Sequence, residues 1–260
     1  MGFRRLFGWG SGGGDQEPPE IDTQITTVAP MPGRSVEGEV LLKGGSQGLR
    51  ISHLNLDVVA KGRYYDGTMT DDEVTGLSTG RYEITVAPGA EERVPFHGKL
   101  PWECPVTELR GQTLGVDVSL ATRLSWETES PVRDVDFLHI AAPPLYEAVL
   151  DAFGEAGYLV DGSQLIDGYI PDVEAHRGLY QSFFLGDRSR GADRFGELEV
   201  VFFQNVVGAL VHVRRAARST YDWSDKPPVR TFAVAHHEAG RADLTARVHK
   251  ALDQLALIDG

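Results

Sequence analysis

The sequence predicts a mainly β protein, with an antiparallel β-sandwich in its N-terminal part and a β-rich C-terminal part that carries two helices. Apolar residues recur at every second position over roughly residues 21–123, which is the period of a strand with one buried face. Turn-forming pairs of glycine and proline separate these runs. Beyond the first 20 residues, helical spacing occurs only after residue 124, at two places. Several short strands without helices indicate a sandwich or a barrel.

The alternation is clearest in four segments of the N-terminal part. Val36, Val40 and Leu42 alternate with Glu37 and Glu39, so that one face of this segment is apolar and the other is charged. The same pattern recurs at 54–58, 82–86 and 114–120. Turns are expected between these strands, at Pro32-Gly33, Gly44-Gly45, Asp66-Gly67, Pro88-Gly89 and Gly111.

The C-terminal part mixes strands with two helices. A helix is expected after Pro143-Pro144, because proline suits the first helical turn and the apolar residues that follow have helical spacing. They are Leu145, Ala148, Val149, Ala152 and Phe153. A second helix is expected over 242–255. Strands are expected at 134–140, 179–185, 198–203, 209–215 and 229–236.

We therefore expect three regions. Residues 1–20 form a flexible tail and a Gly/Ser/Pro tether, 21–124 the sandwich, and 125–260 the C-terminal β-rich domain. The tail mixes large apolar groups with two arginines and could contact a membrane or a partner. Its contact residues would be Phe3, Arg4, Arg5, Leu6, Phe7 and Trp9. A disordered tail and packing on the protein's own surface are the alternatives.

Charge and cysteine content restrict the class of protein. Lysine and arginine number 25 against 38 acidic residues, a net charge of -13, which disfavours contact with nucleic acid phosphates. The single cysteine, Cys104, cannot form an intramolecular disulfide and fits a reducing compartment. We see neither a signal peptide nor an apolar stretch of membrane-spanning length. A cytoplasmic protein is expected, with the tail able to reach the inner face of the cell membrane.

Several segments resemble the sporulation-control Spo0M (SpoOM) family. The resemblance rests on 36–40 and 43–45, on the strand at 51–59, and on Leu100-Pro101-Trp102-Glu103-Cys104-Pro105 with the segments before it. It covers roughly 21–255, and it implies an arrestin-like N-terminal fold and a role in bacterial sporulation or cell-cycle control. The chain departs from the family at Cys104, where a hydroxyl residue is expected, and in the Gly-rich tether after Trp9. The resemblance brings no catalytic residues with it.

Few motifs suggest chemistry. The segment 44–48 matches G-x-S-x-G around Ser46, but strand periodicity follows it where a nucleophile elbow needs a helix, so we expect a hairpin turn. His236-His237-Glu238 could suggest a metal site, yet adjacent strand residues point to opposite faces and a strand end is preferred. We expect neither catalytic nor metal-binding residues, and no cofactor.

Charged residues near the predicted domain boundary could instead hold the two halves together. The candidates for inter-domain charge pairs are Arg123, Arg133, Asp134 and Asp136, with ordinary surface charge as the alternative. The sequence thus predicts a non-catalytic adaptor or regulatory protein that binds protein partners and no nucleic acid. The alternatives are a peripheral membrane or self-assembling scaffold and, less favoured, a serine hydrolase that uses Ser46. The oligomeric state stays open.

Overall fold

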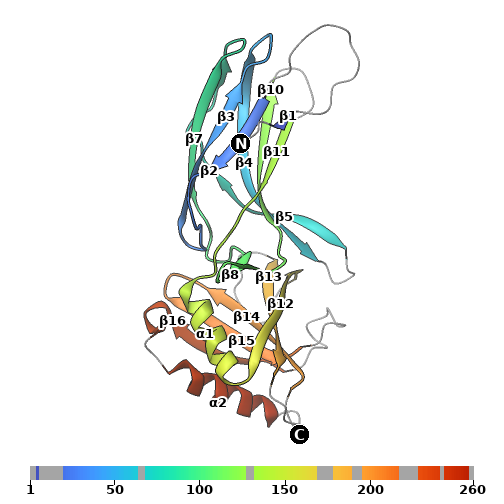
Figure 1. Ribbon diagram of the computed structural model, residues 1–260, viewed down its shortest axis with the longest axis vertical. Coiled ribbons are helices and arrows are strands. Elements are labelled where there is room, and N and C mark those ends of the chain that lie inside the picture. Colours follow the sequence, from blue (N-terminus) through green and yellow to red (C-terminus); the bar gives the residue numbers. More distant parts are fainter. Residues whose placement is uncertain are drawn as a thin grey trace.

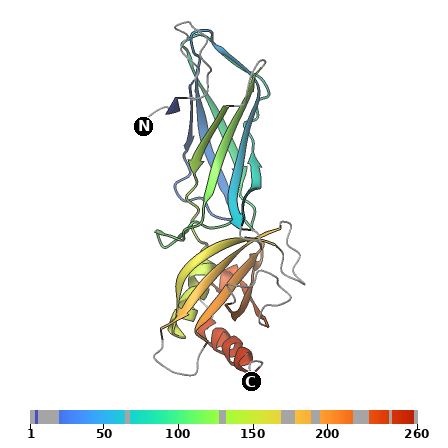
Figure 2. The same cartoon turned by 90° about the vertical axis from the view of Figure 1, so that its right-hand side faces the viewer.

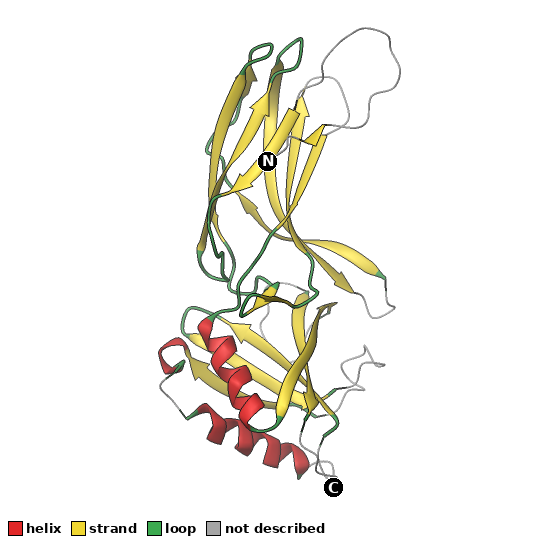
Figure 3. Ribbon diagram, viewed as in Figure 1, coloured by secondary structure: helices red, strands yellow, loops and turns green. Residues whose placement is uncertain are grey.

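The computed structural model contains an elongated N-terminal β-sandwich above a C-terminal half in which two helices cover a sheet (Figures 1 and 2). This is the mainly β architecture that the sequence predicted, and the helices are confined to the C-terminal half (Figure 3). The structure describes residues 4–5, 20–63, 68–126, 132–168, 178–188, 195–216, 228–240 and 243–257.

The first layer of the sandwich is an antiparallel sheet of order β1-β2-β3-β7. Its strands are β1 (Arg4–Arg5), β2 (Glu20–Ile25), β3 (Ser35–Lys43) and β7 (Glu91–Lys99). The second layer belongs to a larger sheet and contains β4 (Leu49–Arg63), β5 (Met69–Leu77), β6 (Ile84–Val86), β10 (Val118–Trp126) and β11 (Val132–Phe137). Side chains of the two inner faces interdigitate, and the alternation seen in the sequence supplies them.

The C-terminal half continues the larger sheet through β12 (Tyr158–Asp167), β13 (Leu179–Asp187), β14 (Glu197–Gln204), β15 (Gly208–Arg215) and β16 (Arg230–Ala235). The helices α1 (Pro144–Glu155) and α2 (Leu244–Ala256) pack on one face of it and contact each other. The 3-10 turn η2 (His236–Glu238) follows β16, and the small pair β8 (Glu108–Leu109) and β9 (Gln112–Thr113) lies between the halves. In the described part of the chain, no helix has the length and apolarity that crossing a bilayer requires.

The two halves share one continuous hydrophobic core. The Gln181 side chain of β13 forms two hydrogen bonds with the backbone of Val106, as a neighbouring strand would. Its amide nitrogen donates to the Val106 carbonyl at 2.8 Å, and its amide oxygen accepts from the Val106 N–H at 2.9 Å. The Thr107 hydroxyl accepts from the N–H of Ile140 at 2.8 Å. Polar groups at this junction are therefore satisfied across the connecting segments, which favours one fixed arrangement.

Three local expectations differ from the structure. The expected boundary at residue 124 falls inside β10, and β11 pairs with β10, so the sandwich continues through Phe137. Strand β12 was missed, because a bulge between Val160 and Gly162 breaks its alternation. The turn at Gly44-Gly45 joins β3 and β4 in different sheets, so it is an arch between the layers rather than a hairpin.

Candidate functional site

The candidate site lies where the central strand β4 loses its neighbour. One edge of β4 pairs with β10 along most of its length. The other edge pairs with β6 at 49–51 and with β5 at 56–63, and no described strand pairs with residues 53–55 on this edge. A bulge lies at the same place, since Ile51 pairs with Trp126 and His53 with Ser125, which leaves one extra residue in β4.

The gap forms because the chain after β5 crosses to the other sheet. The backbone of Ser78 pairs with His97 of β7, with N–H to carbonyl distances of 3.0 Å in both directions. Leu77 then packs over Gly98, where an added Cβ would lie 2.5 Å from the Leu77 Cδ2 atom. Glycine at this position of β7 lets the crossing strand approach the sheet closely.

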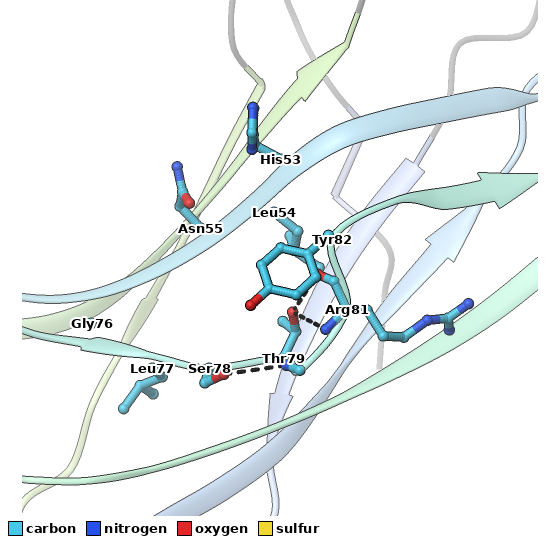
Figure 4. A pocket seen from close by; sticks show the side chains of 10 residues that line it. His53, Leu54, Asn55, Gly76, Leu77, Ser78, Thr79, Arg81 and Tyr82 are labelled. Atoms are coloured by element: carbon cyan, nitrogen blue, oxygen red, sulfur yellow. Dashed lines mark hydrogen bonds between the residues drawn. The ribbon is translucent and has the colours of Figure 1, made fainter.

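A pocket of about 370 Å³ occupies the gap (Figure 4). Its floor is β4, and its wall is the end of β5 with the loop that follows. The lining residues are His53, Leu54, Asn55, Gly76, Leu77, Ser78, Thr79, Gly80, Arg81 and Tyr82. Tyr82 is 89% exposed and stands at the rim, and the Arg81 side chain points away from the other lining groups.

The wall loop is held by its own hydrogen bonds. The Ser78 hydroxyl accepts from the Gly80 N–H at 3.2 Å, and the Thr79 hydroxyl accepts from the Arg81 N–H at 3.3 Å. Gly80 has a φ of +65°, a backbone conformation that favours glycine. Arg81 is anchored to Glu92 of β7 by an ion pair of 2.6 Å. The pocket is thus preformed rather than assembled from long mobile side chains.

The pocket offers polar and apolar groups that can bind a ligand. Its lining combines an amide, an imidazole, two hydroxyls and a phenol with the aliphatic surface of Leu54 and Leu77. The hydroxyls of Ser78 and Thr79 are engaged with the backbone of their own loop, so neither is paired with a base. An open strand edge beside hydrogen-bonding side chains suits an extended peptide, which needs backbone partners and small side-chain pockets.

Comparisons with known proteins decide the family. The sequence model of the Spo0M family (SpoOM protein) matches residues 5–214 of this chain. The chain belongs to the Spo0M family. It is 27% identical over 219 residues to the sporulation-control protein Spo0M of Bacillus subtilis strain 168, which covers 80% of each chain. The crystal structure of Spo0M from Bacillus subtilis superposes with a TM-score of 0.80 at 22% identity, over 92% of this chain and 99% of that one.

In this Spo0M-family chain, the charged residues singled out from the sequence lie within the sandwich. Arg123 forms an ion pair with Asp57 of the neighbouring strand β4. Asp134 is buried and accepts from the backbone N–H of Thr23 in β2 at 3.2 Å, so it joins the two sheets. Neither contact is the inter-domain pair that the sequence suggested, because β11 belongs to the sandwich. Asp136 is half-buried on the same strand, and the side chain of Arg133 lies outside the described residues.

The tail residues and Ser46 are the other positions that the sequence singled out, and some of them lie outside the described residues. Arg4 and Arg5 form β1, which pairs with Glu20 and Ile21 of β2. The remaining tail contacts, Phe3, Leu6, Phe7 and Trp9, lie outside the described residues. Ser46 is exposed in the arch before β4, and a strand rather than a helix follows it, so the nucleophile elbow is absent there.

The His236–Glu238 segment is a 3-10 turn rather than the strand end that the sequence suggested. The Glu238 carboxylate accepts from the Ala235 N–H at 2.8 Å and forms an ion pair with Arg247. Within the described ranges, His, Cys, Asp and Glu side chains nowhere gather in threes as a metal site would require.

The C-terminal sheet contains a buried charged cluster that the sequence analysis missed. Arg214 of β15 donates from Nε and a terminal nitrogen to Glu199 of β14 at 2.8 and 2.7 Å, and the Ser182 hydroxyl of β13 donates to the same carboxylate at 2.6 Å. Both charged side chains are only 2% exposed. Beside them, burial and then the charge of Arg214 lower the pKa of His212 to about 4. The available signal was an acidic residue, Glu199, and a basic residue, Arg214, within strands that are otherwise mostly apolar.

Proposed function

We propose that this chain is a non-catalytic adaptor of the sporulation-control type, which binds an extended segment of a partner protein in the pocket beside β4. The supporting observation is the interrupted ladder, because a partner strand could use the edge of β4 that β5 and β6 leave uncovered. The polar lining adds hydrogen-bonding groups for the side chains of such a segment. A role in sporulation control comes from the relative's name and belongs to the same proposal.

The binding energy in this proposal comes from backbone pairing and from one exposed aromatic. Tyrosine is enriched at protein interfaces, since its ring buries a large area while its hydroxyl keeps a polar partner. Tyr82 stands almost fully exposed at the rim, where a bound segment would cover it. A partner held only by this pocket would bind transiently, as regulatory partners do.

A crosslinking pull-down from the native cells tests the proposal. Three proteins are compared: the full chain, residues 15–260, and the double variant Asn55→Ala/Tyr82→Ala, which changes two exposed lining side chains. We expect a discrete partner set with the first two and its loss with the double variant. Gln47→Ala, in the exposed arch before β4, serves as the matched control.

Two results would count against the pocket. Partners that the double variant retains would place recognition elsewhere on the sandwich. Partners that only the full chain recovers, and residues 15–260 lose, would make the N-terminal tail the recognition element.

A further inference from the structure

The open edge of β4 in the candidate pocket is a single residue long. The Lys61 N–H donates to the Asp117 carbonyl at 3.0 Å, on the side of β10, and the register between β4 and β10 then runs down to His53 without a shift. Successive residues of a strand direct their N–H and C=O groups to alternate edges. Of residues 53–55, only Leu54 therefore directs both groups into the gap between β5 and β6.

These two backbone groups are held in place, and they have no hydrogen-bond partner among the described residues. Leu54 lines the pocket while its side chain packs against the hydrophobic core, which fixes the strand at this position. The two hydroxyls of the wall loop are engaged, because Ser78 accepts from the Gly80 N–H and Thr79 donates to the Arg81 carbonyl at 3.2 Å. The pocket thus presents one donor and one acceptor side by side, without an ordering cost.

The chain itself shows which side chain fits such a pair of groups. At the junction of the two halves, the Gln181 carboxamide donates to the carbonyl and accepts from the N–H of Val106, at 2.8 and 2.9 Å. A carboxamide carries a donor and an acceptor on one carbon, so it matches both groups of a single residue. A carboxylate offers acceptors alone, and an ammonium or guanidinium offers donors alone. Each of these would leave one group of Leu54 unpaired.

The rest of the lining gives an ionic side chain little compensation for lost water. None of the ten lining residues is acidic, so a bound cation would find no counter-charge there. The Arg81 side chain points away from the other lining groups and pairs with Glu92 (Figure 4). The imidazole of His53 is the remaining group that could meet a carboxylate. At the rim, the exposed Tyr82 can cover the aliphatic stem of a bound side chain.

We propose that the partner segment bound in this pocket carries an asparagine or glutamine, whose carboxamide donates to the Leu54 carbonyl and accepts from the Leu54 N–H. The inference rests on the adaptor role proposed above and names the chemical group that the pocket recognises. An extended backbone alone would gain at most one pair of hydrogen bonds at an edge of this length. The preference for one segment over another therefore comes from a side chain.

The test uses the isotopically labelled full chain and four peptides of five residues that differ only at the central position. The flanking residues are threonine and valine, and the central residue is glutamine, N,N-dimethylglutamine, glutamate or methionine. Dimethylglutamine keeps the carbonyl acceptor but has no donor, glutamate has acceptors alone, and methionine has neither a donor nor a strong acceptor.

The titrations are followed by NMR at the backbone amide of Leu54. We expect the glutamine peptide to shift this signal and to slow its hydrogen exchange, and the other three peptides to bind about tenfold more weakly or less. Tyr82→Ala should weaken the glutamine peptide by a similar factor. Met69→Ala, at an exposed apolar position of β5 outside the pocket, should leave its binding unchanged.

Three results would overturn the inference. Equal binding of all four peptides would show that the pocket takes an extended backbone whatever its side chain. An unshifted Leu54 amide with the glutamine peptide would show that its two groups bind nothing of this kind. Tighter binding of the glutamate peptide would assign the pocket to an acidic side chain that meets His53. The adaptor role is judged separately, by whether Asn55→Ala/Tyr82→Ala loses the partner set in the pull-down.

Discussion

Replacing Arg214 by methionine should destabilise the C-terminal half strongly. The Arg214 side chain is 2% exposed and makes two hydrogen bonds to Glu199. Its removal leaves the Glu199 carboxylate buried, with the Ser182 hydroxyl still donating to it at 2.6 Å. Breaking a buried ion pair on one side costs roughly 3–5 kcal/mol. At roughly 2–4 °C per kcal/mol for a protein of this size, the melting temperature should fall by roughly 6–20 °C.

The design includes a reversal and a control. Glu199→Leu/Arg214→Met removes both charges and should recover most of the lost stability, because a buried pair is replaceable by apolar residues of similar volume. Arg188→Met removes an exposed partner of Asp161 and should cost less than about 1 kcal/mol. Urea titrations at neutral pH measure all three. A cost for Arg214→Met no larger than for Arg188→Met would refute the reasoning.

Three further predictions concern His212, Gly98 and Ser46. His212 is buried and its pKa in the folded protein is lowered from 6.5 to about 4, so the unfolded chain binds a proton first and the free energy of unfolding should fall by up to about 3 kcal/mol as the pH drops from about 6.5 to 4. A plot of the urea midpoint against pH should show this fall for the natural protein and be flatter for His212→Phe. The same plot for both proteins would contradict the prediction. Gly98→Val should displace Leu77, cost about 1–3 kcal/mol of stability and disturb the pocket. Thermal melts would measure the loss of stability, and the NMR signals of residues 78–82 would report the change in the pocket. An unaltered spectrum would refute the close packing of Leu77 on Gly98. A fluorophosphonate probe should not label the chain, and labelling that Ser46→Ala removes would restore the hydrolase alternative.

Local sequence patterns predicted elements better than their partners. Both helices were predicted at the right places, since each has an amphipathic stripe, and Pro143-Pro144 marked the start of the first. The arrangement of β11 was not predictable in this way, because its pairing with β10 is a tertiary choice. Strand β12 was missed for a local reason, because the bulge between Val160 and Gly162 interrupts the alternation that the strand otherwise keeps.

The candidate site could not be predicted from the sequence, because it also depends on contacts between distant segments. The pocket arises because β5 leaves β4 and Ser78 pairs with His97 of the other sheet, and no local pattern encodes that exchange. Its position in the chain placed Asp134 near the predicted domain boundary but could not give its partner, which is the backbone of Thr23, 111 positions away in the chain. Register and strand crossing therefore set both the pocket and the charge contacts.

Site-specific photocrosslinking tests the central claim most directly. A benzophenone amino acid is introduced at Thr79 in the wall of the pocket, and separately at Gln47 in the arch before β4, and both proteins are irradiated in the native cells. The account predicts discrete adducts of defined mass from position 79 and none of them from position 47. The same adducts from both positions, or none from position 79, would contradict the adaptor role that we assign to the pocket.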